Sequence, residues 1–116
     1  MELDDLVSDW LALPDLAEAI DVPLGKVRQF LREGRLVAVE RGHPPVKQVP
    51  AELVADGQLI KGLAGALTVL RDAGYSDVEA LRWLLTPDPS IPGRPVDEMA
   101  AGRHTAVKRR AQVLAF

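Results

Sequence analysis

Residues 13–50 read LPDLAEAIDVPLGKVRQFLREGRLVAVERGHPPVKQVP, and they contain the signals of two short helices followed by a β-hairpin. Pro14 suits the first turn of a helix, and Asp21-Val22-Pro23 ends that helix. A second helix is predicted over Leu24–Glu33, because its apolar residues recur on one face at helical spacing. The short connection forces the two helices to cross, which is typical of a helix-turn-helix.

A β-hairpin is predicted directly after the second helix. Gly34 stands where a left-handed helix cap is needed, and Val37–Val39 has the β-branched residues of a strand. Val46–Val49 alternates apolar and polar residues as a returning strand would, after a loop that contains Gly42 and two prolines. The predicted fold class is therefore mainly α, a winged helix-turn-helix with a two-stranded wing. We expect this wing to be the only sheet.

Helices are expected on both sides of this headpiece, the name used below for residues 13–50. The expected elements are an apolar-striped helix over residues 1–12, a short helix or connector over 51–59, and helices over 59–73, 76–85 and 96–114. Ser76 and Glu79 have the spacing of a capping box, which marks a helix start. We predict a DNA-binding domain over residues 1–55 and a helical C-terminal domain over 56–116 that packs on it.

Basic residues are concentrated in the headpiece, although the chain has a net charge of −3. Residues 24–49 contain six basic residues and two acidic ones, whereas residues 1–23 contain seven acidic residues and no Lys or Arg. A local positive field suits contact with phosphates, and ordinary solvated charge is the alternative. The candidate DNA-binding residues are Gly25, Lys26, Arg28, Gln29, Arg32, Arg35, Arg41, His43 and Lys47.

The outward face of the second helix predicts how these contacts divide between bases and backbone. Gln29 and Arg32 point away from the apolar face, and their side chains can pair with adenine and guanine edges in the major groove. Phosphate contacts are expected from the flanking and wing residues Lys26, Arg28, Arg41 and Lys47. His43 is expected either at a phosphate or in solvent.

The sequence gives little support for catalysis, metal binding or membrane insertion. It has no cysteine, two histidines (His43 and His104) and no Gly-rich phosphate loop. We therefore expect no enzyme activity, no metal site and no cofactor. We also expect a cytoplasmic protein, because there is no long apolar run and the first residues lack a signal-peptide profile.

Segments along nearly the whole chain resemble known DNA-binding families. Residues 22–27 (VPLGKV) and 31–39 (LREGRLVAV) resemble the winged helix-turn-helix of MerR-like and excisionase-like proteins. The chain also closely resembles a family of small actinobacterial winged-helix DNA-binding proteins, first described as a mycobacterial serine/threonine kinase substrate. The segments that carry this resemblance are 31–39, 61–63, 74–75, 82–90, 94–97 and 109–112. It implies DNA binding, no catalysis, and a C-terminal domain of poorly defined role.

Two classes of function follow. A transcriptional regulator would bind double-stranded DNA through the headpiece. The alternative is a protein-interaction module, antitoxin-like or regulatory, that acts through the C-terminal helices; Trp83-Leu84, residues 94–97 and Gly102 resemble part of the toxin-contacting domain of helix-turn-helix antitoxins. The family resemblance also implies a serine/threonine protein kinase as a partner. In that family the target threonine lies in a leading extension, and this sequence has no threonine before Thr68.

Overall fold

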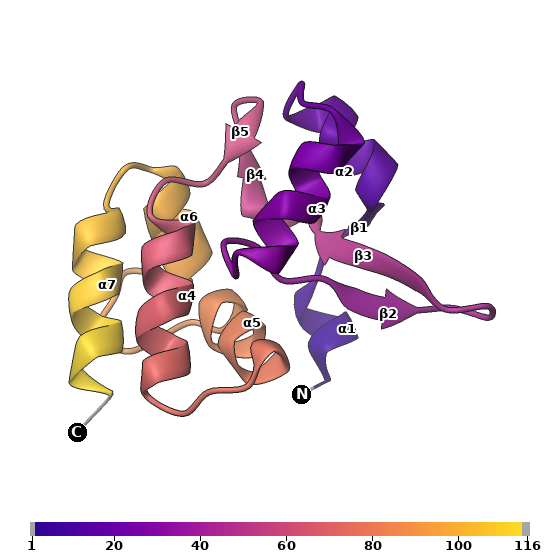
Figure 1. Ribbon diagram of the computed structural model, residues 1–116. Coiled ribbons are helices and arrows are strands. Elements are labelled where there is room, and N and C mark those ends of the chain that lie inside the picture. Colours follow the sequence, from indigo (N-terminus) through magenta and orange to yellow (C-terminus); the bar gives the residue numbers. More distant parts are fainter. Residues whose placement is uncertain (1, 115–116) are drawn as a thin grey trace.

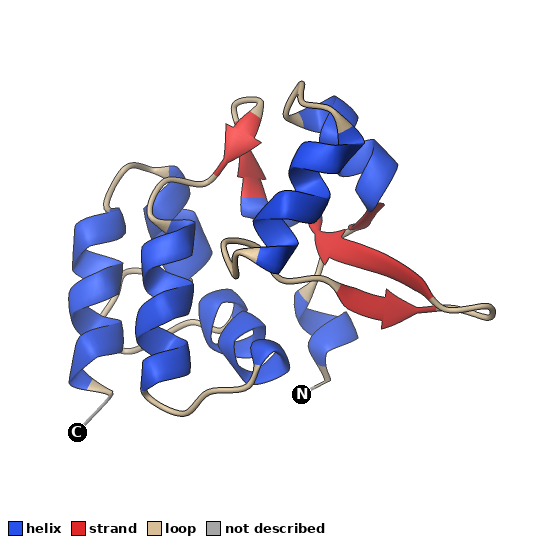
Figure 2. Ribbon diagram, in the orientation of Figure 1, coloured by secondary structure: helices blue, strands red, loops and turns tan. Residues whose placement is uncertain are grey.

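The structure, a computed structural model, describes residues 2–114. Strands lie mainly on the headpiece side of the molecule, and helices make up the C-terminal side (Figures 1 and 2). The elements in chain order are α1 (Leu3–Leu6), β1 (Trp10–Ala12), α2 (Leu13–Ala19), α3 (Leu24–Arg32), β2 (Val39–Arg41), β3 (Val46–Pro50), η1 (Ala51–Leu53), β4 (Val54–Ala55), β5 (Gln58–Leu59), α4 (Leu63–Asp72), α5 (Asp77–Leu85), α6 (Pro95–Ala100) and α7 (His104–Val113).

Helices α2 and α3 form the predicted helix-turn-helix. The amide of Val22 donates to the carbonyl of Ala17 over 3.0 Å, which closes the turn between them. Asp21 takes a positive φ of 55° in this turn. Val27 is completely buried and anchors α3 in the core, so the opposite face of the helix is left to solvent. The prediction of both helices is confirmed, and α3 ends one residue earlier than expected.

The wing is confirmed as the antiparallel hairpin of β2 and β3, but its first strand is Val39–Arg41 and not the predicted Val37–Val39, because Val37 is buried in the core before the strand begins. The sheet is also larger than predicted. β1 pairs with the other edge of β3, from Trp10 opposite Pro50 to Ala12 opposite Gln48, so the strand order is β1-β3-β2. The expected helix over residues 1–12 is therefore wrong, because α1 ends at Leu6. Pairing with β1 satisfies backbone groups on an edge of β3 that a two-stranded wing would leave open.

A second, two-stranded sheet lies between the two halves of the chain. β4 pairs with β5 through a turn in which Asp56 and Gly57 both have positive φ, 54° and 74°. This is the conformation that an Asp-Gly pair favours in a tight hairpin. The wing is thus not the only sheet, and α4 begins at Leu63 because Leu59 belongs to β5.

The C-terminal half consists of α4 to α7. Ser76 and Glu79 form the predicted capping box at the start of α5, with Ser76 Oγ accepting the Glu79 amide at 3.2 Å. The single helix expected over residues 96–114 is wrong: α6 and α7 are separate, and Gly102 between them has a φ of 92°. A residue in this conformation cannot continue a right-handed helix.

One hydrophobic core extends through both halves of the molecule. It contains Leu16, Val27 and Val49 from the headpiece, and Leu67 and Leu84 from the C-terminal helices, all completely buried. α1 contacts α5, and η1 contacts α6, so segments from both ends of the sequence pack together. None of the helices within residues 2–114 is long and apolar enough to cross a membrane.

Candidate nucleic-acid interface

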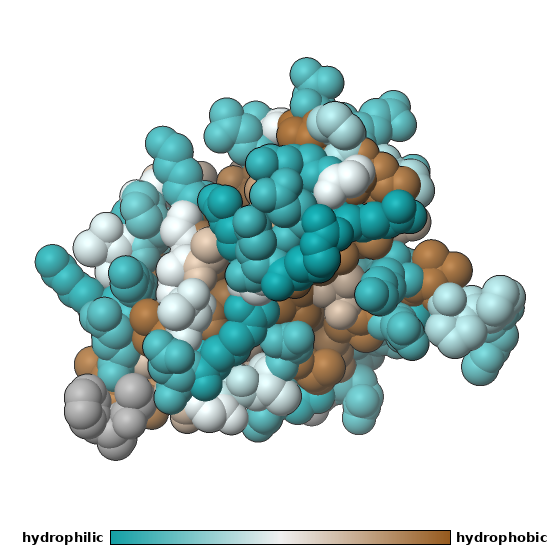
Figure 3. Space-filling view, viewed as in Figure 1, coloured by the Kyte–Doolittle hydropathy of each residue, from teal (hydrophilic) through white to brown (hydrophobic). Residues whose placement is uncertain are grey.

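The outward face of α3 presents the basic residues that the sequence predicted there. Lys26, Arg28 and Arg32 are exposed, and Gly25 has open space where a side chain would begin. Gln29 is half-buried, and its Nε2 donates to Glu33 Oε2 over 3.1 Å. In the space-filling view this face is the most hydrophilic area over α3 (Figure 3). The helix therefore carries cations on the side opposite its buried anchor.

A groove between α3 and the wing brings three predicted contact residues together. Arg28 and Arg32 reach it from α3, and Lys47 reaches it from β3. The apolar part of its lining is Leu13 and Leu31. None of the three cations has a carboxylate within 4.0 Å among residues 2–114, so their charges are not neutralised by the fold. The groove is suited to an anionic ligand.

Two further cations flank Phe30, near the C-terminal end of α3. The Nζ of Lys26 and the Cζ of Arg35 both lie 5.3 Å from the centre of the Phe30 ring. Arg35 is also 4.0 Å from Glu33, with both side chains exposed. Contacts with the ring hold both side chains close to the protein surface, and their charged ends remain available to solvent.

The structure does not bring Arg41 and His43 into the groove. Arg41 is paired with Asp4 of α1, and its guanidinium lies 4.2 Å from the centre of the Trp10 ring. His43 is exposed in the loop at the tip of the wing. Arg41 is thus bound to the N-terminal segment, whereas His43 is open to solvent.

Arg71 is a contact to α3 that the sequence analysis missed. Its Nη1 donates to the carbonyl of Gly34, directly after α3, and its Nε donates to Asp77 over 3.1 Å. Gly34 has a φ of 72°, and a side chain at this position would meet the Arg71 guanidinium 2.8 Å away. A C-terminal residue therefore supports the end of α3. No local signal identifies a contact between residues 37 positions apart.

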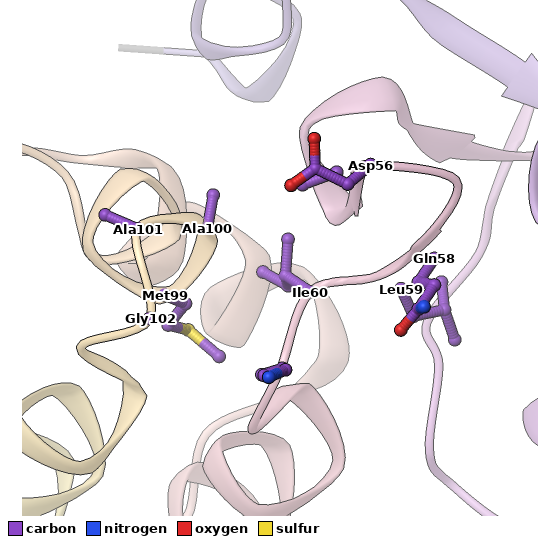
Figure 4. A pocket seen from close by; sticks show the side chains of 10 residues that line it. Asp56, Gln58, Leu59, Ile60, Met99, Ala100, Ala101 and Gly102 are labelled. Atoms are coloured by element: carbon purple, nitrogen blue, oxygen red, sulfur yellow. The ribbon is translucent and has the colours of Figure 1, made fainter.

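A separate pocket, which no residue of α3 lines, lies between the β4–β5 hairpin and the end of α6 (Figure 4). Asp56 and Lys61 are its charged lining residues, and its apolar lining includes Met99 and Ile60. No cluster of His, Cys, Asp or Glu within residues 2–114 has the geometry of a metal site. The cationic face of α3 is thus the stronger candidate site.

The helix-turn-helix, the wing and the cationic face of α3 define a winged helix-turn-helix protein. Residues 3–54 match the family model described as "DNA-binding protein Rv2175c, wHTH domain", and residues 60–115 match "Rv2175c C-terminal domain of unknown function". The chain is 45% identical over 117 residues to DNA-binding protein Rv2175c of Mycobacterium tuberculosis (strain ATCC 25618 / H37Rv), covering 90% of this chain and 79% of the relative. The chain belongs to the Rv2175c family.

A solved structure supports the same assignment. The NMR structure of Rv2175c superposes with a TM-score of 0.79 at 42% sequence identity, and the match covers 93% of this chain and 82% of that one. The likeness therefore includes the C-terminal helices as well as the headpiece.

Proposed function

We propose that this protein binds double-stranded DNA as a cytoplasmic transcriptional regulator, with α3 in the major groove and the wing on the sugar-phosphate backbone. The observation that carries the proposal is the groove where Arg28, Arg32 and Lys47 meet without an acidic partner within residues 2–114. The name of the M. tuberculosis relative, a DNA-binding protein, supports it. No catalytic step is part of the proposed function.

The groove residues and Gln29 have two different proposed roles. Arg32 and Gln29 face outward from α3 and read base edges, while Arg28 and Lys47 contact phosphates. Gly25 permits close approach of the backbone to DNA, since nothing occupies the space beside it. Secondary phosphate contacts come from Lys26, Arg35 and His43, and from Arg41 if DNA displaces it from Asp4.

The proposal is tested by selecting bound sequences from a random duplex pool and titrating the variants with a selected and a scrambled duplex. Arg28→Ala should weaken binding to both duplexes, because a phosphate contact is independent of sequence. Gln29→Ala should reduce the preference for the selected duplex by about 1–3 kcal/mol and leave binding to the scrambled duplex nearly unchanged. Wild-type affinity in both variants would contradict the proposal.

A protein partner on the C-terminal half is the second candidate. Val78 of α5 is 39% exposed and lines a groove between the two halves, in which Arg82 is the other C-terminal residue and the remaining lining, including Trp10 and Val39, comes from the N-terminal half. This surface is compatible with a regulatory partner, including the serine/threonine kinase that the family resemblance implies. Val78→Lys would abolish such an interaction without changing DNA affinity. This variant therefore separates binding of a protein partner from binding of DNA.

A further inference from the structure

The cationic surface of α3 continues onto the C-terminal half. Arg35 lines a second groove with Phe30 on one side and the first turn of α4, residues 62–65, on the other. Lys108 of α7 lies beyond that turn, against Gly65. We call Arg35, Ala64, Gly65 and Lys108 the α4–α7 face. A pale band of weakly polar surface lies over α4, directly beside the hydrophilic surface of α3 (Figure 3).

Lys108 lies against α4 at Gly65. The Cδ, Cε and Nζ atoms of Lys108 lie 3.8–3.9 Å from the position that a Cβ of Gly65 would occupy. The lysine therefore lies along α4 and carries its charge to the helix turn that borders the Arg35 groove. Gly65 is helical and its φ is not in the left-handed region, so this position accepts a side chain without backbone strain.

The cations of α7 and its N-cap fall into two groups. Arg103 forms two hydrogen bonds with Glu98, including Nη2 to Oε1 at 2.9 Å, and Arg110 donates to Asp88 over 3.2 Å. Both arginines stabilise the C-terminal fold through these pairs. Lys108 and Arg109 are exposed and have no carboxylate within 4.0 Å among residues 2–114, and of these two only Lys108 lies against Gly65 of α4.

We infer that the α4–α7 face is a second contact surface for the phosphate backbone of the same DNA duplex that α3 reads. The inference rests on the proposed function. Phe30 of α3 and the first turn of α4 line the same groove, so a duplex that covers the cationic face of α3 also lies beside the C-terminal half. Lys108 supplies one phosphate contact and Arg35 another, on the side of α3 opposite the wing.

The first test uses the salt dependence of binding to a duplex of about two helical turns. Each phosphate contact contributes about 0.9 to the slope of log affinity against log salt, so Lys108→Ala should lower that slope by about one. When the salt concentration rises from 50 to 200 mM, the affinity of the wild type should fall by a factor about three to four times larger than the factor for the variant. Arg109→Ala is the matched control, because adjacent residues on a helix face different directions.

The second test separates DNA contact from folding. Gly65→Glu places a carboxylate beside Lys108, whereas Gly65→Gln adds a neutral side chain of the same shape. An acidic residue in the first turn of a helix is favourable and a glycine inside a helix is not, so Gly65→Glu should unfold at a temperature at least as high as the wild type. It should nevertheless show a salt slope lower by about one than Gly65→Gln.

The outcomes distinguish this inference from the proposed function. The α4–α7 face does not contact DNA, and the inference is overturned, if two results are found while Arg28→Ala still weakens binding. The first is a salt slope of Lys108→Ala equal to that of the wild type, and the second is a salt slope of Gly65→Glu equal to that of Gly65→Gln. If Arg28→Ala also has no effect, the proposed function itself fails. If Gly65→Glu does not fold, the comparison of the salt slopes of Lys108→Ala and Arg109→Ala decides whether the α4–α7 face contacts DNA.

Discussion

At the scale of single residues, ion pairing separates the cations that stabilise the fold from those available to a ligand. Arg41, Arg71, Arg94, Arg103 and Arg110 each pair with a carboxylate. Lys26, Arg28, Arg32 and Lys47 do not, within residues 2–114. The sequence predicted where the positive charge is concentrated. It could not predict that Arg41 is paired and Lys47 is not, because the partners of Arg41 lie about 30 or more positions earlier in the chain.

Arg41 and Lys47 are therefore expected to respond differently to truncation. Arg41→Ala removes an ion pair with Asp4 and a contact with the Trp10 ring, and should lower the free energy of unfolding by about 1–2 kcal/mol. Lys47→Ala should change stability by less than about 0.5 kcal/mol, because its side chain is exposed. The effect of Lys47→Ala should be on DNA binding, and the slope of log affinity against log salt should fall by about one. Urea unfolding and DNA titration of both variants check the prediction, and the reverse pattern would contradict it.

At the scale of helices and strands, the sequence predicted elements whose signals are local. α3 has its apolar residues on one face, and α5 begins with a capping box, so both were found. β1 was missed because its apolar spacing also fits a helix, and only the open edge of β3, some 40 residues later, selects the strand. The β4–β5 hairpin did carry a local signal, the Asp56-Gly57 pair.

The break between α6 and α7 depends on one glycine, and this gives a prediction. Gly102 has a φ of 92°, where a residue with a Cβ is strained, so Gly102→Ala should lower stability by about 1–2 kcal/mol. Gly65→Ala is the matched control, since Gly65 is helical and has room for a methyl group. This control should raise stability by about 0.5–1 kcal/mol. Thermal unfolding measures both effects. Equal shifts in the two variants would show that the φ of Gly102 is not what separates α6 from α7.

At the scale of the whole molecule, the two halves are joined by polar contacts as well as by the core. Arg71 donates to Gly34 at the end of α3. Glu52 accepts the amide of Ser8 at 2.9 Å and lies 3.5 Å from Arg94, so it connects the N-terminal segment to α6. A fragment of about 55 residues would bury too little surface to be comfortably stable alone. We therefore propose that the domains predicted over residues 1–55 and 56–116 fold as one unit.

Unfolding should then occur in a single transition for both halves. The variants Trp10→Phe and Trp83→Phe each leave one tryptophan as the fluorescence probe of one half. The two probes should give the same midpoint in urea, because both tryptophans pack against one core that is shared by the two halves. Arg71→Ala should lower both midpoints together. Two separate midpoints would show that the halves unfold independently.

Stability should also fall in acid, and Glu98 should contribute to this. Hydrogen bonds from Arg103 lower the pKa of Glu98 below its ordinary value of 4.5, although burial opposes the shift. The unfolded chain then binds more protons than the folded one, so the stability from this pair is complete above pH 4.5 and is lost as the pH falls through the lower folded pKa. Glu98→Gln should weaken the acid dependence of the urea midpoint. Glu18→Gln, at an exposed residue of α2, should not.

Amide chemical shifts of the labelled protein show whether α3 and the wing contact DNA. During titration with a selected duplex, the largest changes should occur at residues 25–32 of α3 and at residues 42, 43, 46 and 47 of the wing, with smaller changes at residues 63–65 of α4. Amides around the pocket at residues 55–58 and 99–101 should not change, because no residue of α3 lines this pocket. Changes confined to the C-terminal helices, with the α3 amides unaffected, would contradict contact between α3 and DNA.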